Sequence, residues 1–219
     1  MSAIRRRVSG TVVDERRFIN RPRDDVRKWL HNANLPHRRW LAEVIVSDPN
    51  VVRILEVGCG WGPNLSVLAD SRSNLRLFGI DISPASIAEG AEQLRGLGYK
   101  NIVLREGQAD NLEFFGVGEM DVVFTDAVLL YVGPDKIRRV LAELCRVARR
   151  RLVLLEMHKP GVRVSGKYTT DGWLHDYKVA LSGLQRFRSM KIERMPCELR
   201  PDGRWPQYGS LIDVSLHDM

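Results

Sequence analysis

The sequence has no apolar run of the roughly 18 residues that a membrane-spanning helix needs, and the charged segment Met1–Arg7 is not followed by the apolar stretch of a secretory signal. Cysteine is also scarce. Cys59, Cys145 and Cys197 are widely spaced and form no C-x-x-C pair. This spacing argues against a disulfide framework and against a zinc or other metal site. We therefore expect a protein that does not enter a membrane and that works in a reducing, cytoplasmic compartment.

The net positive charge is concentrated in the amino-terminal segment. The net charge is +7, and residues 1–23 hold seven arginines against two acids, so this segment accounts for most of the excess. Such an arm suits nucleic acid or an acidic partner, or it is simply a solvated terminus. The whole chain is 44% hydrophobic and 28% charged, which is ordinary for a globular protein. With 219 residues and no internal repeat, it is expected to form a single domain.

From Val51 onward, apolar runs alternate with helical patterns, which predicts a parallel sheet with crossover helices. The expected strands are 51–57, 75–80, 101–105, 121–124 and 152–156, and two further strands, 190–195 and 210–216, form a terminal pair around the turn-rich segment 200–206. The expected helices are 63–71, one capped by Ser83 and Pro84, one starting at Gly133–Pro134, and one that Thr170 or Asp171 caps and that carries His175, Asp176 and Tyr177. Residues 20–47 are predicted to form a helical cap, with its second helix opening at Pro36, and residues 158–170 a loop.

The segment Glu56–Gly62 reads EVGCGWG and lies between a predicted strand and a predicted helix. Alternate glycines let the backbone turn tightly and approach a ligand without Cβ atoms in the way. A dinucleotide-binding loop instead has the spacing G-x-G-x-x-G. The segment resembles motif I, E/D-x-G-x-G-x-G, of the class I S-adenosylmethionine-dependent methyltransferases.

Three later segments extend this resemblance to about residues 50–157. Asp81 ends the second strand, where an acid can accept both ribose hydroxyls, in nicotinamide-binding proteins as well as in this family. Gly107–Phe114 resembles the family's G-D-A-x-x-L-P-F segment beside the adenine, with Gln108 in place of its aspartate, so either Gln108 or Asp110 is expected to hold the adenine. Asp121–Val132 resembles F-D-x-V-x-x-x-x-x-L-x-x-V.

The resemblance implies an α/β fold with a Rossmann-like, seven-stranded, mostly parallel sheet, helices on both faces and an antiparallel terminal strand. It implies S-adenosylmethionine as cofactor and S-adenosylhomocysteine as product. The expected organisation is a basic leader (1–19), a helical cap (20–47), a cofactor-binding core (50–157) and a substrate-side segment (158–219). The expected cofactor-binding residues are Glu56, Gly58, Cys59, Gly60, Gly62, Asp81, Ile82, Gln108, Ala109, Asp110 and Thr125.

The expected reaction is methyl transfer to an oxygen or nitrogen of a small-molecule acceptor. A general base is needed only if the acceptor arrives protonated, and the candidates are His175, His158 and Tyr131. No N-P-P-Y or D-P-P-Y follows the fourth strand, which disfavours nucleic acid as the acceptor. The alternatives are an RNA or protein methyltransferase that uses the basic arm, and a cofactor-binding protein without turnover. The sequence does not indicate an oligomeric state.

Overall fold

The computed structural model describes residues 33–162, 165–169 and 172–217, with side chains outside 163–171. Its helices are α2 (Pro36–Ile45), α3 (Pro63–Ser71), α4 (Pro84–Gly96), α5 (Ile137–Val147), α6 (Tyr177–Leu181) and α7 (Trp205–Tyr208), with short 3-10 turns η2 (Leu129–Tyr131) and η3 (Cys197–Leu199). Its strands are β1 (Arg53–Val57), β2 (Arg76–Asp81), β3 (Ile102–Glu106), β4 (Met120–Asp126), β5 (Ala148–Met157), β6 (Ser165–Thr169), β7 (Gly172–His175), β8 (Phe187–Arg194) and β9 (Gly209–Leu216).

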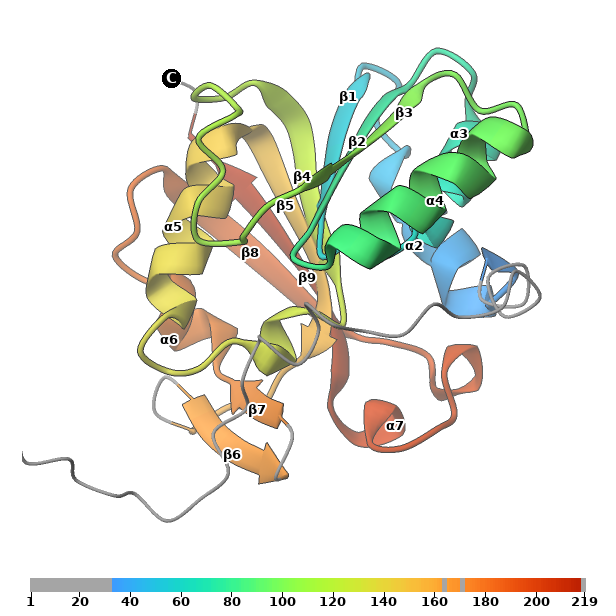
Figure 1. Cartoon of the computed structure of the whole chain (residues 1–219). Coiled ribbons are helices and arrows are strands. Elements are labelled where there is room, and N and C mark those ends of the chain that lie inside the picture. Colours follow the sequence, from blue (N-terminus) through green and yellow to red (C-terminus); the bar gives the residue numbers. More distant parts are fainter. Residues whose placement is uncertain (1–32, 163–164, 170–171, 218–219) are drawn as a thin grey trace, which may run out of the picture.

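Seven strands form one sheet in the order β3-β2-β1-β4-β5-β9-β8. β1 to β5 pair in parallel, whereas β9 is antiparallel to both β5 and β8. Helices α2, α3 and α4 lie on one side of the sheet and α5 and α6 on the other (Figure 1). The expected fold class, including the antiparallel terminal strand, is therefore confirmed.

The core consists of two apolar layers, one on each face of the sheet, because consecutive strand residues point to opposite faces. In β4, Val123 packs with α5 and α6, whereas Val122 and Phe124 pack with α2 and α3. Strands buried on both faces read as continuous apolar runs, which is why β4 and β5 were visible in the sequence.

Because β1, β2 and β4 run parallel to one another, their carboxyl ends lie at the same edge of the sheet. Open α/β sheets bind ligands beyond this edge. Two other segments reach it: α2, which begins at Pro36 as predicted, and the long connection between β8 and β9 that carries η3 and α7 (Figure 1). The part of the predicted cap before residue 33 and the basic leader lie outside the described residues.

Two predictions for the segment after β5 are wrong. Residues 165–169 and 172–175 form the antiparallel pair β6–β7 rather than a loop and the start of a helix. The following helix, α6, begins only at Tyr177, and the Asp176 carboxylate caps it by accepting from the Lys178 N–H at 3.1 Å.

The fifth strand is longer than the predicted 152–156. β5 begins at Ala148, so Arg149, Arg150 and Arg151 belong to it. β9 extends the pairing of β5, and Arg151 forms an ion pair with Asp213 at 2.7 Å.

Within the described ranges, no helix combines the length and the apolar character that crossing a membrane would require.

Candidate cofactor and acceptor site

The glycine loop joins β1 to α3 and is fixed to the neighbouring strand. Gly58, Gly60 and Gly62 all have left-handed φ angles, of +80°, +54° and +82°, which glycine adopts at little cost. The N–H groups of Gly58 and Cys59 both donate to the carbonyl of Ile80 on β2, at 2.7 and 3.0 Å. These two hydrogen bonds fix the turn at the end of β1.

Two of these glycines have different steric surroundings. A Cβ on Gly58 would lie 2.3 Å from Cγ2 of Val128, so a side chain there collides with the wall formed after β4. A Cβ on Gly60 would have no neighbour within 4 Å. The space beside Gly60 is therefore open to a ligand.

Asp81, at the end of β2, holds the loop from the other side. Its Oδ2 accepts from the Gly60 N–H at 2.8 Å, and its Oδ1 accepts from the Ser83 N–H at 2.9 Å. Ser83 in turn caps α4 by accepting from the Ser86 N–H at 3.2 Å. An ionised carboxylate offers about four acceptor positions in all.

Glu56, on β1, is buried in the floor of the site. Its Oε1 accepts from Nδ2 of Asn64 at 2.6 Å, while its Oε2 has no hydrogen-bond partner among the residues that the structure describes. Burial raises the pKa of the Glu56 carboxyl to about 8, an effect that the Asn64 hydrogen bond and the Arg38 charge only partly oppose. The free site therefore contains a mostly protonated acid near neutral pH.

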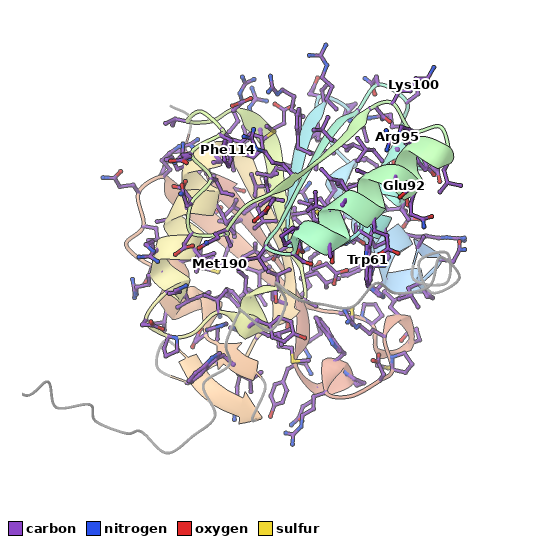
Figure 2. The ribbon with its side chains drawn as sticks, viewed as in Figure 1. Trp61, Glu92, Arg95, Lys100, Phe114 and Met190 are labelled. Atoms are coloured by element: carbon purple, nitrogen blue, oxygen red, sulfur yellow. The ribbon has the colours of Figure 1, made fainter. Side chains whose placement is uncertain are left out.

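These groups line one cavity of about 390 Å³. The predicted site residues that line it are Glu56, Gly58, Cys59, Gly60, Asp81, Ile82, Ala109, Asp110 and Tyr131. Trp61 also lines it and lies between the glycine loop and α4, where it packs with Leu94 (Figure 2). The lining runs from Ala109 and Asp110 after β3 to Tyr131 after β4, so the cavity is an elongated site across the sheet edge.

The other predicted site residues do not line this cavity. Gly62 serves as the N-cap of α3. Gln108 is exposed and does not line the cavity, whereas Asp110 does. His158 and His175 are both buried behind the wall, where Nε2 of His175 lies 2.8 Å from the carbonyl of Leu129.

Thr125 also points away from the cavity, because its hydroxyl donates to Oε1 of Glu156 at 2.8 Å. The same oxygen accepts from the N–H groups of Val128 and Leu129, at 2.9 and 3.0 Å. Burial raises the pKa of Glu156 to about 7. Thr125 and Glu156 thus anchor the segment after β4, in which Ala127 has a φ of +59° and Val128 packs against Gly58.

A charged cluster that the sequence analysis missed closes one end of the cavity. Asp126 ends β4, and its side chain is 4% exposed. Nη1 of Arg38 lies 3.3 Å from Asp126 Oδ2, and Nη1 of Arg200 lies 3.3 Å from Asp126 Oδ1. Nε2 of His37 lies 3.4 Å from Oδ2, at an angle that does not make a hydrogen bond.

Burial alone would raise the pKa of the Asp126 carboxyl, but His37 and the two guanidinium groups outweigh it and hold that pKa well below its usual range. The acid at the end of β4 follows the same strand-end rule that identified Asp81, so the sequence did hold a signal for it. Its partners carry no such signal, because they come from α2 and from the β8–β9 connection.

No group of three or more histidine, cysteine or acidic side chains in the described parts of the chain is arranged to hold a metal ion.

Comparisons with known proteins agree with this architecture. Residues 54–151 match the family described as a methyltransferase domain. Protein-L-isoaspartate O-methyltransferase 1 of Syntrophobacter fumaroxidans is 33% identical over 91 residues, which are 42% of this chain and 39% of that protein. The chain spans well under half the length of the curated relatives it matches.

Two solved structures share the fold over nearly the whole chain. Magnesium protoporphyrin IX methyltransferase of Synechocystis PCC 6803, with bound S-adenosylmethionine, has a TM-score of 0.62 and 17% identity, covering 92% of this chain and 89% of that one. Geranyl diphosphate C-methyltransferase of Streptomyces coelicolor A3(2), with Mg²⁺, a substrate analogue and S-adenosylhomocysteine, has a TM-score of 0.65 and 16% identity, covering 95% and 86%. Residues 54–151 thus match a methyltransferase-domain family, and the chain shares the fold of these two methyltransferase structures.

Proposed function

We propose that the chain transfers a methyl group from S-adenosylmethionine to an oxygen or nitrogen atom of a small organic acceptor. The observation that carries this proposal is Oε2 of Glu56, which is buried in the cavity floor without a hydrogen-bond partner among the described residues. A buried polar atom without a partner is costly, and a ligand ammonium group would satisfy it. The methionine end of the cofactor carries such a group.

The residues around the cavity fit the rest of the cofactor. The Asp81 carboxylate suits the ribose hydroxyls, and the open space beside Gly60 admits the sugar close to the backbone. Ala109 and Asp110 lie where the adenine would sit. When bound, the cofactor supplies a methyl group on a positively charged sulfur, which is already an activated donor.

At the methionine end, Arg38 is linked to Glu56 through Asn64. Nη1 of Arg38 donates to Oδ1 of Asn64 at 2.6 Å, and Asn64 donates to Glu56 at 2.6 Å. This chain of contacts places a guanidinium beside the group that would hold the ammonium. Arg38 is therefore suited to the methionine carboxylate, by the charge-assisted pairing typical of arginine.

The protein's contribution to the reaction is alignment and exclusion of water. Tyr131 is the one predicted base candidate that lines the cavity, whereas His158 and His175 are buried behind its wall. We propose that an acceptor that arrives deprotonated needs no base, and that Tyr131 orients a protonated one.

A small acceptor is favoured because the mouth is narrowed by two segments. α2 and the β8–β9 connection meet through Asp126, which pairs with Arg38 and Arg200. The similarity to the magnesium protoporphyrin IX methyltransferase supports a small acceptor. The similarity to the isoaspartate methyltransferase supports the alternative, a protein acceptor. The cytoplasmic location and the single-domain organisation remain predictions.

The test is transfer of label from methyl-labelled S-adenosylmethionine to a metabolite extract, with products read by mass. We expect a small product heavier by one CH₂ unit, and label found only in protein or RNA would contradict the proposal. A chain lacking residues 1–23 is the control for the basic arm. Unchanged activity and no salt dependence in that variant would exclude an electrostatic role of the arm.

A further inference from the structure

Three charged side chains lie at the acceptor end of the cavity. Two guanidinium groups, from Arg38 and Arg200, face one carboxylate, that of Asp126. Arg38 is assigned to the cofactor's carboxylate, so Arg200 is the cation that remains for an acceptor. An anionic group on the acceptor is the partner that a guanidinium suits.

Arg200 is the cation best placed to meet an acceptor. Its guanidinium carbon lies 4.0 Å from the ring centroid of Trp205, which is itself buried, and its Nη1 is fixed by Asp126. Within the described part of the chain, its other N–H groups have no hydrogen-bond partner, and the residue lines the cavity. A guanidinium that stacks on an aromatic ring and pairs with one carboxylate is already oriented, so its remaining N–H groups can bind a second oxyanion.

His37 lies at the same place. The residue is 2% exposed and lines the cavity, and its Nε2 lies 3.4 Å from Oδ2 of Asp126. His37 therefore helps to hold the carboxylate that fixes Arg200.

We propose that the acceptor carries a carboxylate or phosphate group and that Arg200, supported by Trp205 and Asp126, binds it. This inference rests on the proposed methyl transfer and adds the class of acceptor. The anionic group is the part of the acceptor that Arg200 binds. The atom that is methylated lies elsewhere on the acceptor, toward the glycine loop.

The cofactor's own carboxylate is the competing anion. Arg38 contacts the Asn64–Glu56 pair directly, whereas Arg200 approaches it only through Asp126. Arg38 therefore belongs with the cofactor and Arg200 with the acceptor, and this assignment predicts that Arg200 does not contribute to S-adenosylhomocysteine affinity.

The experiment uses the full chain saturated with S-adenosylhomocysteine. Binding of 4-fluorobenzoate, 4-fluorophenyl phosphate and the neutral 4-fluorobenzamide is followed by ¹⁹F NMR. We expect at least one anion to bind roughly tenfold or more tightly than the amide, because hydrogen bonds to charged groups are worth that much. The anion that binds more tightly shows whether Arg200 prefers a carboxylate or a phosphate group on the acceptor.

Arg200→Gln should remove this preference for the anion while leaving amide binding and S-adenosylhomocysteine affinity within about twofold, since only the charged fork is lost. Arg200→Lys should restore part of the preference, because the charge remains but the fork does not. Arg188→Gln, an equal charge change at an exposed residue on β8, should have no effect.

Several outcomes would overturn the inference. Equal or absent binding of all three probes, or an Arg200→Gln variant that weakens anion and amide alike, would mean that Arg200 only holds the fold together. Loss of S-adenosylhomocysteine affinity in Arg200→Gln would assign it to the cofactor's carboxylate. Failure of the wild-type chain to bind S-adenosylhomocysteine would instead refute the proposed function itself.

Discussion

Binding of S-adenosylhomocysteine should release a proton from Glu56. Burial raises the pKa of its carboxyl to about 8, so at pH 7 only about a tenth of the free protein carries an ionised Glu56. A ligand ammonium beside Oε2 favours the charged form and lowers that pKa. If the carboxyl is fully ionised in the complex, about 0.9 proton leaves for each ligand bound at pH 7.

The same linkage makes the affinity depend on pH. Below the pKa of the free protein, ionising Glu56 must precede the ion pair, so affinity rises with pH. Between pH 6.5 and 7.5 the association constant should increase about eightfold, and it should level off above pH 8. The assay is isothermal titration calorimetry in phosphate and in Tris, because the two buffers take up a released proton with different enthalpies.

Two variants isolate the effect. Glu56→Gln keeps a side chain that can bond Asn64 but cannot titrate, so proton release and the rise in affinity should both disappear. Glu156→Gln is the matched control, because Glu156 is also buried with a raised pKa of about 7 but does not line the cavity. Wild-type protein that releases no proton, with an affinity that is flat from pH 6.5 to 7.5, would refute the reasoning.

Three further predictions follow from the same geometry. Gly60→Ala should weaken S-adenosylhomocysteine binding at least tenfold, because the added methyl group enters open cavity space. Gly183→Ala is the control: Gly183 has a similar left-handed φ of +77° but lies outside the cavity, so this variant should lose only about 1–2 kcal/mol of stability. Equal ligand affinity in the two variants would contradict the loop assignment. His175→Ala should lower the melting temperature, since it removes the contact with Leu129, but should preserve the shape of the pH–rate profile; loss of an ascending limb near neutrality would restore His175 as a base. The free energy of unfolding should fall as pH rises from about 4.5 through about 7, because folding keeps Glu156 protonated where the unfolded chain ionises it, and denaturation of Glu156→Gln should show a shallower fall.

Much of the fold was predictable because its signals are local. Strands buried on both faces appear as apolar runs, and Ser83, Pro84 and the alternate glycines mark where helices begin and strands end. The strand-end rule found Asp81, and it applies equally to Asp126, which the sequence analysis quoted without assigning a role.

The failures share a physical cause, which is a partner distant in sequence. Leu174 and Tyr177 have helical spacing, yet Leu174 lies in β7 because pairing with β6 competes successfully with that pattern. The fifth strand was predicted to begin at residue 152, but β5 begins at Ala148, pairs with β9, and carries Arg151, whose charge is paired with Asp213, 62 residues away. The pairing of Arg38 and Arg200 with Asp126 likewise joins segments that no local pattern connects.

The central claim is that the cavity beside the glycine loop holds S-adenosylmethionine in one orientation. A crystal structure of the full chain with S-adenosylhomocysteine tests it most directly. We predict the ligand ammonium in contact with Oε2 of Glu56, both ribose hydroxyls on Asp81, and the adenine between Ala109 and Asp110. A ligand bound with its adenine at Glu56, or a cavity left empty by a ligand bound elsewhere, would contradict the account.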